Sequence, residues 1–463
     1  MLCSMRSLVL LITVAFVAAA CGSAGATQPE VVLAAPSPTT APTALPVVPS
    51  PAASPGGLAP VSAGAVPEAG VVYVWGADDG IYHYDGATGA LTQVWRASSL
   101  GRETAYGPYV LGRHGGTTLL KWDGTTQQIC GGGNWSVVST RGQCAWSGTA
   151  ADRAVYTDAP EGGNGATVPR MLLPADWGAG TFEWDSSGLE LAVIRNEARP
   201  EPARQHQTLW VMDLRHGTLR KVFDPPTETS FIFGVKWSPD RLVSFWESAT
   251  TSASFGADGV LTSLHVVNVD TAADADLGMT LQDRAWAQWS SDGRLAFVRG
   301  GGRETWLSKQ VVILEADGQQ RVVAGDATVH PTASSRSALA PAWQPAYGQP
   351  QLAWIESPAV SDASPDYFRG IGPSAARIAV VEDGRRISCR GLITEGVRLN
   401  ATATAALLLC RVPGVEHQAL QLWFTPIGGT PRALVTGLGD LGFGYYGLQP
   451  SLLDLTAWSL ADR

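Results

Sequence analysis

The sequence predicts an all-β protein in which a four-stranded antiparallel unit is repeated along most of the chain. Three observations support this prediction. The 463 residues include 52 glycines and 17 tryptophans but only 16% charged residues, which excludes a coiled coil and, for most of the chain, disorder. A hairpin pattern that contains tryptophan recurs at a nearly constant spacing. A second hairpin pattern follows each copy of the first.

The first pattern is a tryptophan at the end of a strand, a polar turn and a second apolar strand. Four tryptophans mark it, with spacings of 53, 52 and 54 residues: Trp184, Trp237, Trp289 and Trp343. Residues that favour turns follow them, as in Ser238-Pro239-Asp240. Such turns join antiparallel strands, so each copy predicts a β-hairpin.

The second pattern is an apolar strand, a turn containing Asp or Gly, and another strand with basic residues. Segments 209–222, 311–323 and 378–387 have this pattern. Two hairpins per unit give four antiparallel strands, which is the composition of one propeller blade. Counting the units gives eight blades, and seven is the alternative if residues 105–175 form one irregular blade.

The two ends of the repeated region complement each other. The first unit starts at Val71 and lacks a leading strand, whereas the C-terminal segments 443–448 and 455–460 lack a following hairpin. Unpaired strand edges promote aggregation. The sequence therefore predicts a single β-propeller that is closed by pairing of its N- and C-terminal strands.

The repeats resemble a known family. Trp237-Ser238-Pro239-Asp240 and Trp289-Ser290-Ser291-Asp292-Gly293, each followed by the second hairpin, are similar to the TolB-type β-propeller repeat, a relative of the WD40 repeat. The resemblance covers residues 180–390. It implies a ring of blades around a central channel, and it does not specify an activity.

Residues 1–20 are typical of a secretory signal peptide. Arg6 supplies a positive charge, and the apolar run from Leu8 to Ala20 is shorter than the ~20 residues of a membrane span. The run ends in Ala18-Ala19-Ala20-Cys21, which resembles the bacterial lipobox. That resemblance implies an exported protein, held at the cell membrane by lipid on Cys21 and facing the extracytoplasmic side. The alternative is an ordinary signal peptide, with Cys21 incidental.

The composition changes after the signal. Residues 21–70 consist mainly of Pro, Ala, Ser and Thr, with too little bulky apolar surface to offset the entropy of ordering. We therefore expect a disordered linker over residues 21–70 and a propeller domain over residues 71–463.

Four cysteines remain in the predicted propeller: Cys130, Cys144, Cys389 and Cys410. Export favours disulfides, and three pairings are possible. Cys130–Cys144 and Cys389–Cys410 close the shortest loops, and each would stabilise the fold by about 3 kcal/mol on the chain-entropy model. The alternative is four buried free thiols.

No sequence motif identifies a catalytic site. The serine elbow, the zinc-protease helix and the phosphate-binding P-loop are all missing. Histidines such as His206 and His265 are scattered singly, and the acidic cluster Asp270, Asp274 and Asp276 does not match a calcium loop. We therefore expect no catalytic residues, no metal and no cofactor. The net charge of −9 argues against nucleic-acid binding.

The first functional hypothesis is a non-enzymatic, monomeric binding or scaffold module for a protein or polysaccharide partner, anchored in the membrane by lipid. One alternative is an extracytoplasmic hydrolase or lyase with a site in the channel mouth. Another is a carbohydrate-binding or sensor module. A cluster of two or three carboxylates or histidines would favour the enzyme, because acid–base chemistry needs such groups together.

The lipid anchor gives a direct test. Cys21→Ser removes the atom that would carry the lipid, so the variant should move from the membrane fraction to the soluble fraction, because stable anchoring requires the acyl chains. Fractionation followed by immunoblotting measures this. A variant that stays membrane-bound like the parent would exclude the lipobox interpretation.

Overall fold

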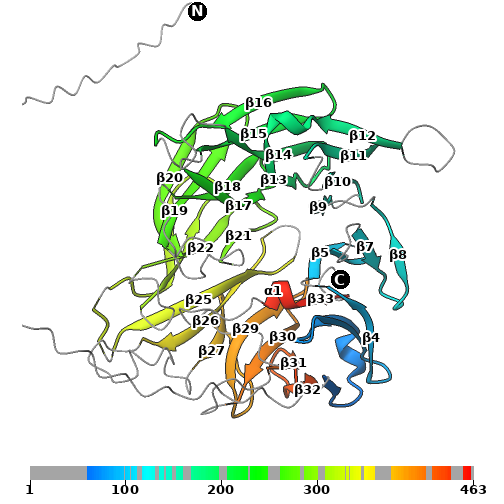
Figure 1. Cartoon of the computed structure of the whole chain (residues 1–463). Helices are drawn as coiled ribbons and strands as arrows, with labels where there is room; N and C mark the ends of the chain where they lie inside the picture. The colour runs from blue at the N-terminus through cyan, green and yellow to red at the C-terminus, as the bar shows by residue number, and fades with distance from the viewer. Residues whose placement is uncertain are drawn as a thin grey trace, which may run out of the picture. The chain divides into compact units, whose positions relative to one another are not determined.

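A computed structural model of the chain (Figure 1) divides it into two compact units, Met1–Ser54 and Pro55–Arg463. The structure describes residues 60–97, 100–104, 106–111, 117–130, 135–139, 142–148, 153–159, 168–197, 206–227, 230–248, 261–281, 286–300, 308–328, 330–332, 334–345, 349–359, 377–412, 420–438 and 452–459. All of these belong to the second unit. The predicted signal peptide and Cys21 lie outside the described residues.

The described residues form antiparallel sheets, as predicted. The first three sheets in chain order contain β33 (Thr456–Trp458), β2 (Val71–Trp75), β3 (Gly80–Asp85) and β4 (Ala90–Arg96); β5 (Leu100–Thr104), β6 (Gly107–Leu111), β7 (Thr117–Leu120) and β8 (Thr126–Gln128); and β9 (Trp135–Val138), β10 (Cys144–Ser147), β11 (Val155–Ala159) and β12 (Val168–Leu173).

The middle of the chain forms the strands that carry the candidate site. One sheet contains β13 (Ala179–Trp184), β14 (Glu190–Glu197), β15 (His206–Asp213) and β16 (Thr218–Phe223). The next is eight-stranded and contains β17 (Phe231–Trp237), β18 (Leu242–Ser248), β19 (Leu261–Asn268), β20 (Asp274–Leu281), β21 (Ala287–Trp289), β22 (Leu295–Arg299), β23 (Gln310–Leu314) and β24 (Gln320–Gly325). A single residue pair, Thr280 with Arg299, joins its two halves.

The last strands form two more sheets. They contain β25 (Arg336–Trp343), β26 (Leu352–Pro358), β27 (Ile378–Val381) and β28 (Arg386–Ile387); and β29 (Ile393–Leu399), β30 (Ala405–Arg411), β31 (Gln421–Pro426), β32 (Arg432–Thr436) and β1 (Val61–Ser62). The described helices are short: η1 (Pro67–Ala69), η2 (Ala175–Trp177) and α1 (Leu452–Leu455). Among the described residues, no helix is long and apolar enough to cross a membrane.

The recurring tryptophans lie where the sequence predicts, at the ends of first strands. Trp237 pairs with Val243 across a hairpin, and its indole Nε1 donates a hydrogen bond to the carbonyl of Glu183, 3.0 Å away in the preceding sheet. Trp343 likewise donates to the carbonyl of Gln288 at 2.8 Å. The indoles of Trp237 and Trp343 therefore fill apolar space and tie one repeat to the repeat before it.

The apolar core lies between neighbouring sheets. Phe223 of β16 and Phe245 of β18 belong to one buried cluster. Val72 of β2 and Leu422 of β31 belong to another, so the first sheet also packs on the last. Because the sheets are buried on both faces, each depends on its two neighbours.

The N- and C-terminal strands pair, as predicted. Val72, Tyr73 and Val74 of β2 lie opposite Trp458, Ala457 and Thr456 of β33. The Trp458 side chain is fully buried, and its Nε1 donates to the carbonyl of Ala69 at 2.8 Å. The other predicted C-terminal segment, 443–448, lies outside the described residues.

The folded region begins earlier than the sequence suggests. Val61 and Ser62 form β1, which pairs with β32. Val66 and Ala69 are buried in the cluster between the first and last sheets. The expected linker therefore does not extend to residue 70. Val66 and Ala69 are ordered because the first and last sheets, which are distant in sequence, form the apolar cluster in which they are buried.

Both disulfides have the pairing with the shortest loops, Cys130–Cys144 and Cys389–Cys410. The first joins the end of β8 to β10, and the second joins the segment after β28 to β30. Each bond therefore links neighbouring sheets, where it holds an interface together.

Deleting residues 456–463 should destabilise the whole second unit. The deletion leaves one edge of β2 unpaired and removes Trp458, whose burial is worth about 4–6 kcal/mol, against a typical total of about 5–15 kcal/mol. Thermal unfolding measures the effect. The control is deletion of residues 22–54, which should leave the transition unchanged. If the two truncations melt alike, the terminal pairing does not stabilise the fold.

Candidate functional site

A group of titratable side chains lies on one face of strands β18, β19 and β20. Glu247 lies opposite Ser263, and His265 lies opposite Asp276. Side chains two residues apart on a strand share a face, so Glu247 and His265 are diagonal neighbours on this face. Asp274, two residues before Asp276, lies on it as well. The sequence separates these residues, and the register of three strands brings them together.

His265 is held in one orientation. Its Nδ1 lies 3.1 and 3.0 Å from the two carboxylate oxygens of Asp274. Its ring stacks on Phe245, with centroids 5.4 Å apart and planes 8° apart, and it also contacts Phe223 of the preceding sheet. Because Asp274 is an acceptor, Nδ1 carries a proton, and Nε2 is the nitrogen that remains for a substrate.

Two opposing effects determine the protonation of His265. Burial lowers the pKa of His265, since only 8% of the residue is exposed. The hydrogen bond to Asp274 and the charges of Asp274, Asp276 and Glu247 outweigh burial and hold the pKa above its ordinary value of 6.5. His265 therefore holds its second proton more tightly than an ordinary histidine does.

Glu247 is a carboxylate in an unfavourable environment. Its Oε1 is buried and has no hydrogen-bond partner among the described residues. Burial raises the pKa of Glu247 above 4.5, and the charge of Asp276 adds to this, against the opposing attraction of His265. A buried oxygen without a partner is rare in folded proteins and requires an explanation.

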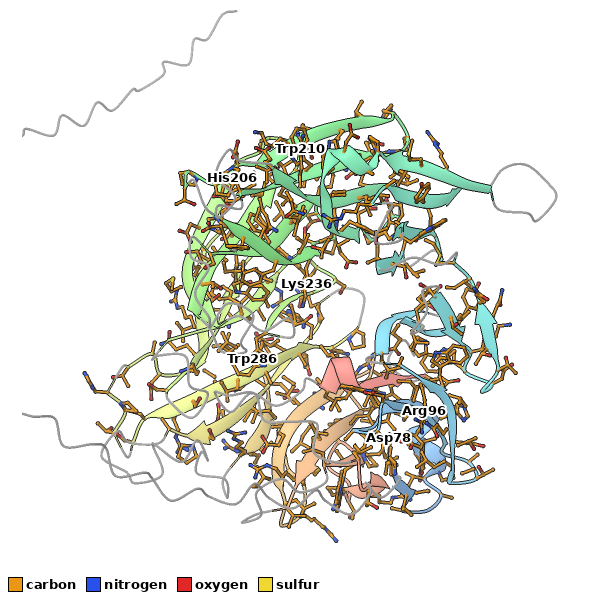
Figure 2. All side chains as sticks on the ribbon, in the orientation of Figure 1. Asp78, Arg96, His206, Trp210, Lys236 and Trp286 are labelled. Atoms are coloured by element: carbon orange, nitrogen blue, oxygen red, sulfur yellow. A yellow bond between two sulfur atoms is a disulfide. The ribbon has the colours of Figure 1, made fainter. Side chains whose placement is uncertain are left out.

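His206 does not belong to this group. It lies on β15, four residues before Trp210 on the same strand (Figure 2). Its Nε2 lies 2.8 Å from Asp224, and its Nδ1 lies 3.1 Å from the carbonyl of Thr227. Both ring nitrogens are therefore occupied. Lys221 also binds Asp224, at 2.5 Å. We interpret His206 as a structural residue.

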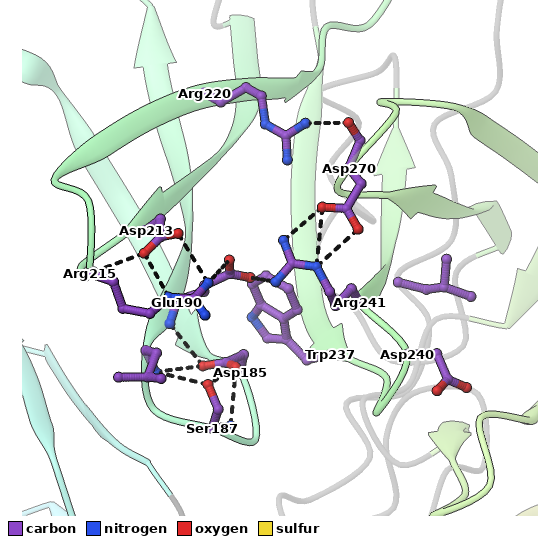
Figure 3. Close-up of polar contacts among 12 residues, drawn as sticks. Asp185, Ser187, Glu190, Asp213, Arg215, Arg220, Trp237, Asp240, Arg241 and Asp270 are labelled. Atoms are coloured by element: carbon purple, nitrogen blue, oxygen red, sulfur yellow. Dashed lines mark hydrogen bonds and ion pairs between the residues drawn. The ribbon is translucent and has the colours of Figure 1, made fainter.

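A second polar region joins the turns of neighbouring repeats (Figure 3). Glu190 is buried and accepts hydrogen bonds from Arg215 at 3.2 Å and from Arg241 at 2.7 Å. Arg241 also binds Asp270. Hydrogen bonds from Arg215 hold the pKa of Asp213 well below its ordinary value, and those from Arg241 lower the pKa of Asp270. Asp213 and Asp270 therefore lose their protons more readily than ordinary aspartates, and the ion pairs bridge the turns.

A cavity of about 560 Å³ lies at the turns that join β21 to β22 and β25 to β26. It is lined by Asp292, Arg294, Glu315, Gln349, Pro350, Gln351, Glu382 and Asp383. Its four carboxylates bind arginines: Asp292 binds Arg294, Asp383 binds Arg385, and Glu315 and Glu382 share Arg321. This cavity is charged, but its acids are neutralised in place.

The described residues contain no group of three or more His, Cys, Asp or Glu that could hold a metal ion. In the sequence, Asp270, Asp274 and Asp276 form one acidic cluster. The structure separates them, because Asp270 binds Arg241 while Asp274 binds His265. Alternation along β18 and along β19 predicts which side chains share a face within each strand, but it does not contain the register that brings Glu247 next to His265.

Comparison with known proteins gives structural matches only. No protein-family model and no curated protein matches the sequence. Porphyromonas gingivalis dipeptidyl peptidase 4 has a TM-score of 0.50 at 8% identity, over 82% of this chain and 59% of that one. The β-propeller domain of the Pyrococcus furiosus Trilobed protease has a TM-score of 0.34 at 11% identity, over 63% of this chain and 80% of that one. An oligogalacturonate lyase in complex with manganese has a TM-score of 0.43 at 13% identity, over 80% of this chain and 96% of that one.

These matches correct the first functional hypothesis. The matches reported above are two peptidases and a lyase, and they contradict the expectation of a non-enzymatic binding or scaffold module. The chain spans 59% of the length of the dipeptidyl peptidase. At these identities the likeness shows the fold alone, an all-β protein of antiparallel sheets consistent with a β-propeller.

Glu247 gives a test by pH. Because the folded state raises its pKa above 4.5, the native protein binds this proton more tightly than the unfolded chain does, and stability falls as pH rises through the raised pKa. Glu247→Gln should therefore be more stable than the parent at pH 7 and no more stable below pH ~4. Denaturant unfolding at both pH values measures this.

The matched control is Glu356→Gln. Glu356 has the position on β26 that Glu247 has on β18, because each lies four residues after the residue that pairs with the tryptophan of its hairpin. Unlike Glu247, Glu356 accepts a hydrogen bond from Trp354 Nε1 at 3.1 Å. Its substitution should not produce this pH-dependent gain. Equal effects of the two variants would mean that Glu247 has no special environment.

Proposed function

We propose that this chain is a hydrolase or lyase in which Glu247 acts as general base and His265 as general acid. The observation that carries the proposal is the buried, unpartnered Oε1 of Glu247 on the same face as a histidine whose ring is fixed by Asp274. Perturbed acid and base pairs of this kind are typical of active sites. The residues of this site lie on strands β18, β19 and β20.

The assignment of roles follows from the two pKa directions. A raised pKa makes ionised Glu247 a stronger base than an ordinary carboxylate. A raised pKa favours the protonated form of His265. In the working form that we propose, Glu247 is a carboxylate and His265 an imidazolium, and Asp274 is the positioning residue that holds the histidine tautomer.

The pair can carry out either reaction class. In hydrolysis, Glu247 takes a proton from water, the water oxygen bonds to the electrophilic atom, the bond to the leaving group breaks with its electron pair, and His265 protonates that group from Nε2. In elimination, Glu247 takes the proton from the carbon next to a carbonyl or carboxylate, and the C–H electrons form the double bond. The bond from the adjacent carbon to the leaving oxygen breaks with its electron pair on that oxygen, which His265 protonates.

We also propose a cellular location and a detailed fold for this enzyme. It would be a lipid-anchored, exported protein, attached through Cys21, with a TolB-like propeller of eight blades as the repeat count indicates. Export agrees with the two disulfides, since such bonds persist outside the reducing cytosol. The apolar clusters between successive sheets, including the first and the last, agree with a closed ring.

The test is turnover of blocked peptide anilides, glycosides and oligouronides. Glu247→Gln and His265→Gln should each lower kcat by about 10²- to 10⁴-fold, while Glu356→Gln keeps the parent rate. The parent pH–rate profile should be a bell, with its acid limb above 4.5 and its basic limb above 6.5. A Glu247→Gln variant as active as the parent would exclude the proposed base.

A further inference from the structure

Three charged side chains form a buried group between β27 and β29. Glu395 lies on β29 with its side chain fully buried, and it pairs with Arg377, just before β27, and with Arg411, at the end of β30. The side chains of Arg377 and Arg411 are 8% and 6% exposed. Burial alone would raise the pKa of Glu395, but the two arginines outweigh burial and lower it. Glu395 is therefore ionised.

Arg377 has unused hydrogen-bond donors. Its Nη1 donates to Glu395, whereas its Nε is buried and has no partner among the described residues. A guanidinium carries five N–H donors in a flat fork. Burying such donors without acceptors is costly, so this edge of Arg377 requires an acceptor from outside the group.

The surroundings of Arg377 are rigid. Arg411 directly follows Cys410, which is bonded to Cys389. The backbone N–H of Cys389 donates to Thr394 Oγ1, next to Glu395 in sequence. The disulfide cross-links the segment before β29 to β30, and the ion pair with buried Glu395 orients the guanidinium of Arg377 before any ligand arrives. Such preorganisation lowers the cost of binding.

We propose that the Nε edge of Arg377 is a binding site for a small oxyanion, a carboxylate or a phosphate, that accepts two parallel hydrogen bonds. The planar fork of arginine matches two oxygens of such a group. The small exposed fraction of Arg377 limits the ligand to a compact group or to the end of a longer molecule. This site lies on other strands than Glu247 and does not depend on the proposed reaction.

The test is ligand-dependent thermal stability of the full chain. Acetate and phosphate are titrated separately, with sodium chloride at matched ionic strength as the screening control. Binding to the folded state raises Tm progressively with ligand concentration. We expect a saturating rise with at least one of the two oxyanions, and the one that acts identifies the ligand chemistry. No rise beyond sodium chloride with either would overturn the proposal.

Variants then locate the site. Arg377→Gln should abolish the rise, whereas Arg386→Gln should keep it, because Arg386 is exposed and pairs with Glu356 on the same sheet. If Arg377→Gln fails to fold, the Arg377 Nε–H resonance of the parent, assigned with Arg377→Lys, should shift on titration. A rise that survives Arg377→Gln, or an Nε–H signal that does not move, would refute the site.

Discussion

The structure depends on one constraint: each sheet is apolar on both faces. Along β14, Leu191 and Val193 pack toward the sheet before, while Ala192 and Ile194 pack toward the sheet after. Exposure of an apolar face to water is unfavourable, so a sheet with two apolar faces needs a neighbouring sheet on each side. The first and last sheets satisfy this need by packing on each other. The other features of the molecule are ways of holding these interfaces in register.

Polar groups lie at the edges of the apolar interfaces, where they take different roles. Arginines at the turns bind carboxylates of a neighbouring repeat, as Arg241 does with Glu190 of the preceding one. Glu247 has no such arginine. Its environment instead favours the protonated acid, which costs stability at neutral pH and gives the carboxylate its basicity. In the function that we propose, this is the usual trade between stability and activity.

Sequence patterns predicted the local structure well. The hairpins around Trp237 and Trp343, the two disulfides and the pairing of Val71–Trp75 with the C-terminus all followed from turn chemistry, spacing and strand count. Glu247 and His265 were missed because their proximity is set by the register of three strands, which a single sequence does not specify. The folded segment around Val66 was missed because its composition matches a linker, and only the neighbouring sheets make its burial favourable.

The terminal pairing also orders the events of folding. The cysteines of each disulfide are only 14 and 21 residues apart, so both bonds can form while the chain is still emerging. Trp458 and Ala69, by contrast, meet across 389 residues. Joining segments that far apart costs about 2–3 kcal/mol more loop entropy than joining those of the longer disulfide. The edge of β2 therefore stays unpaired until β33 has been synthesised. Until then, this edge can pair with a strand of another copy of the protein, so the nascent chain must be protected from aggregation.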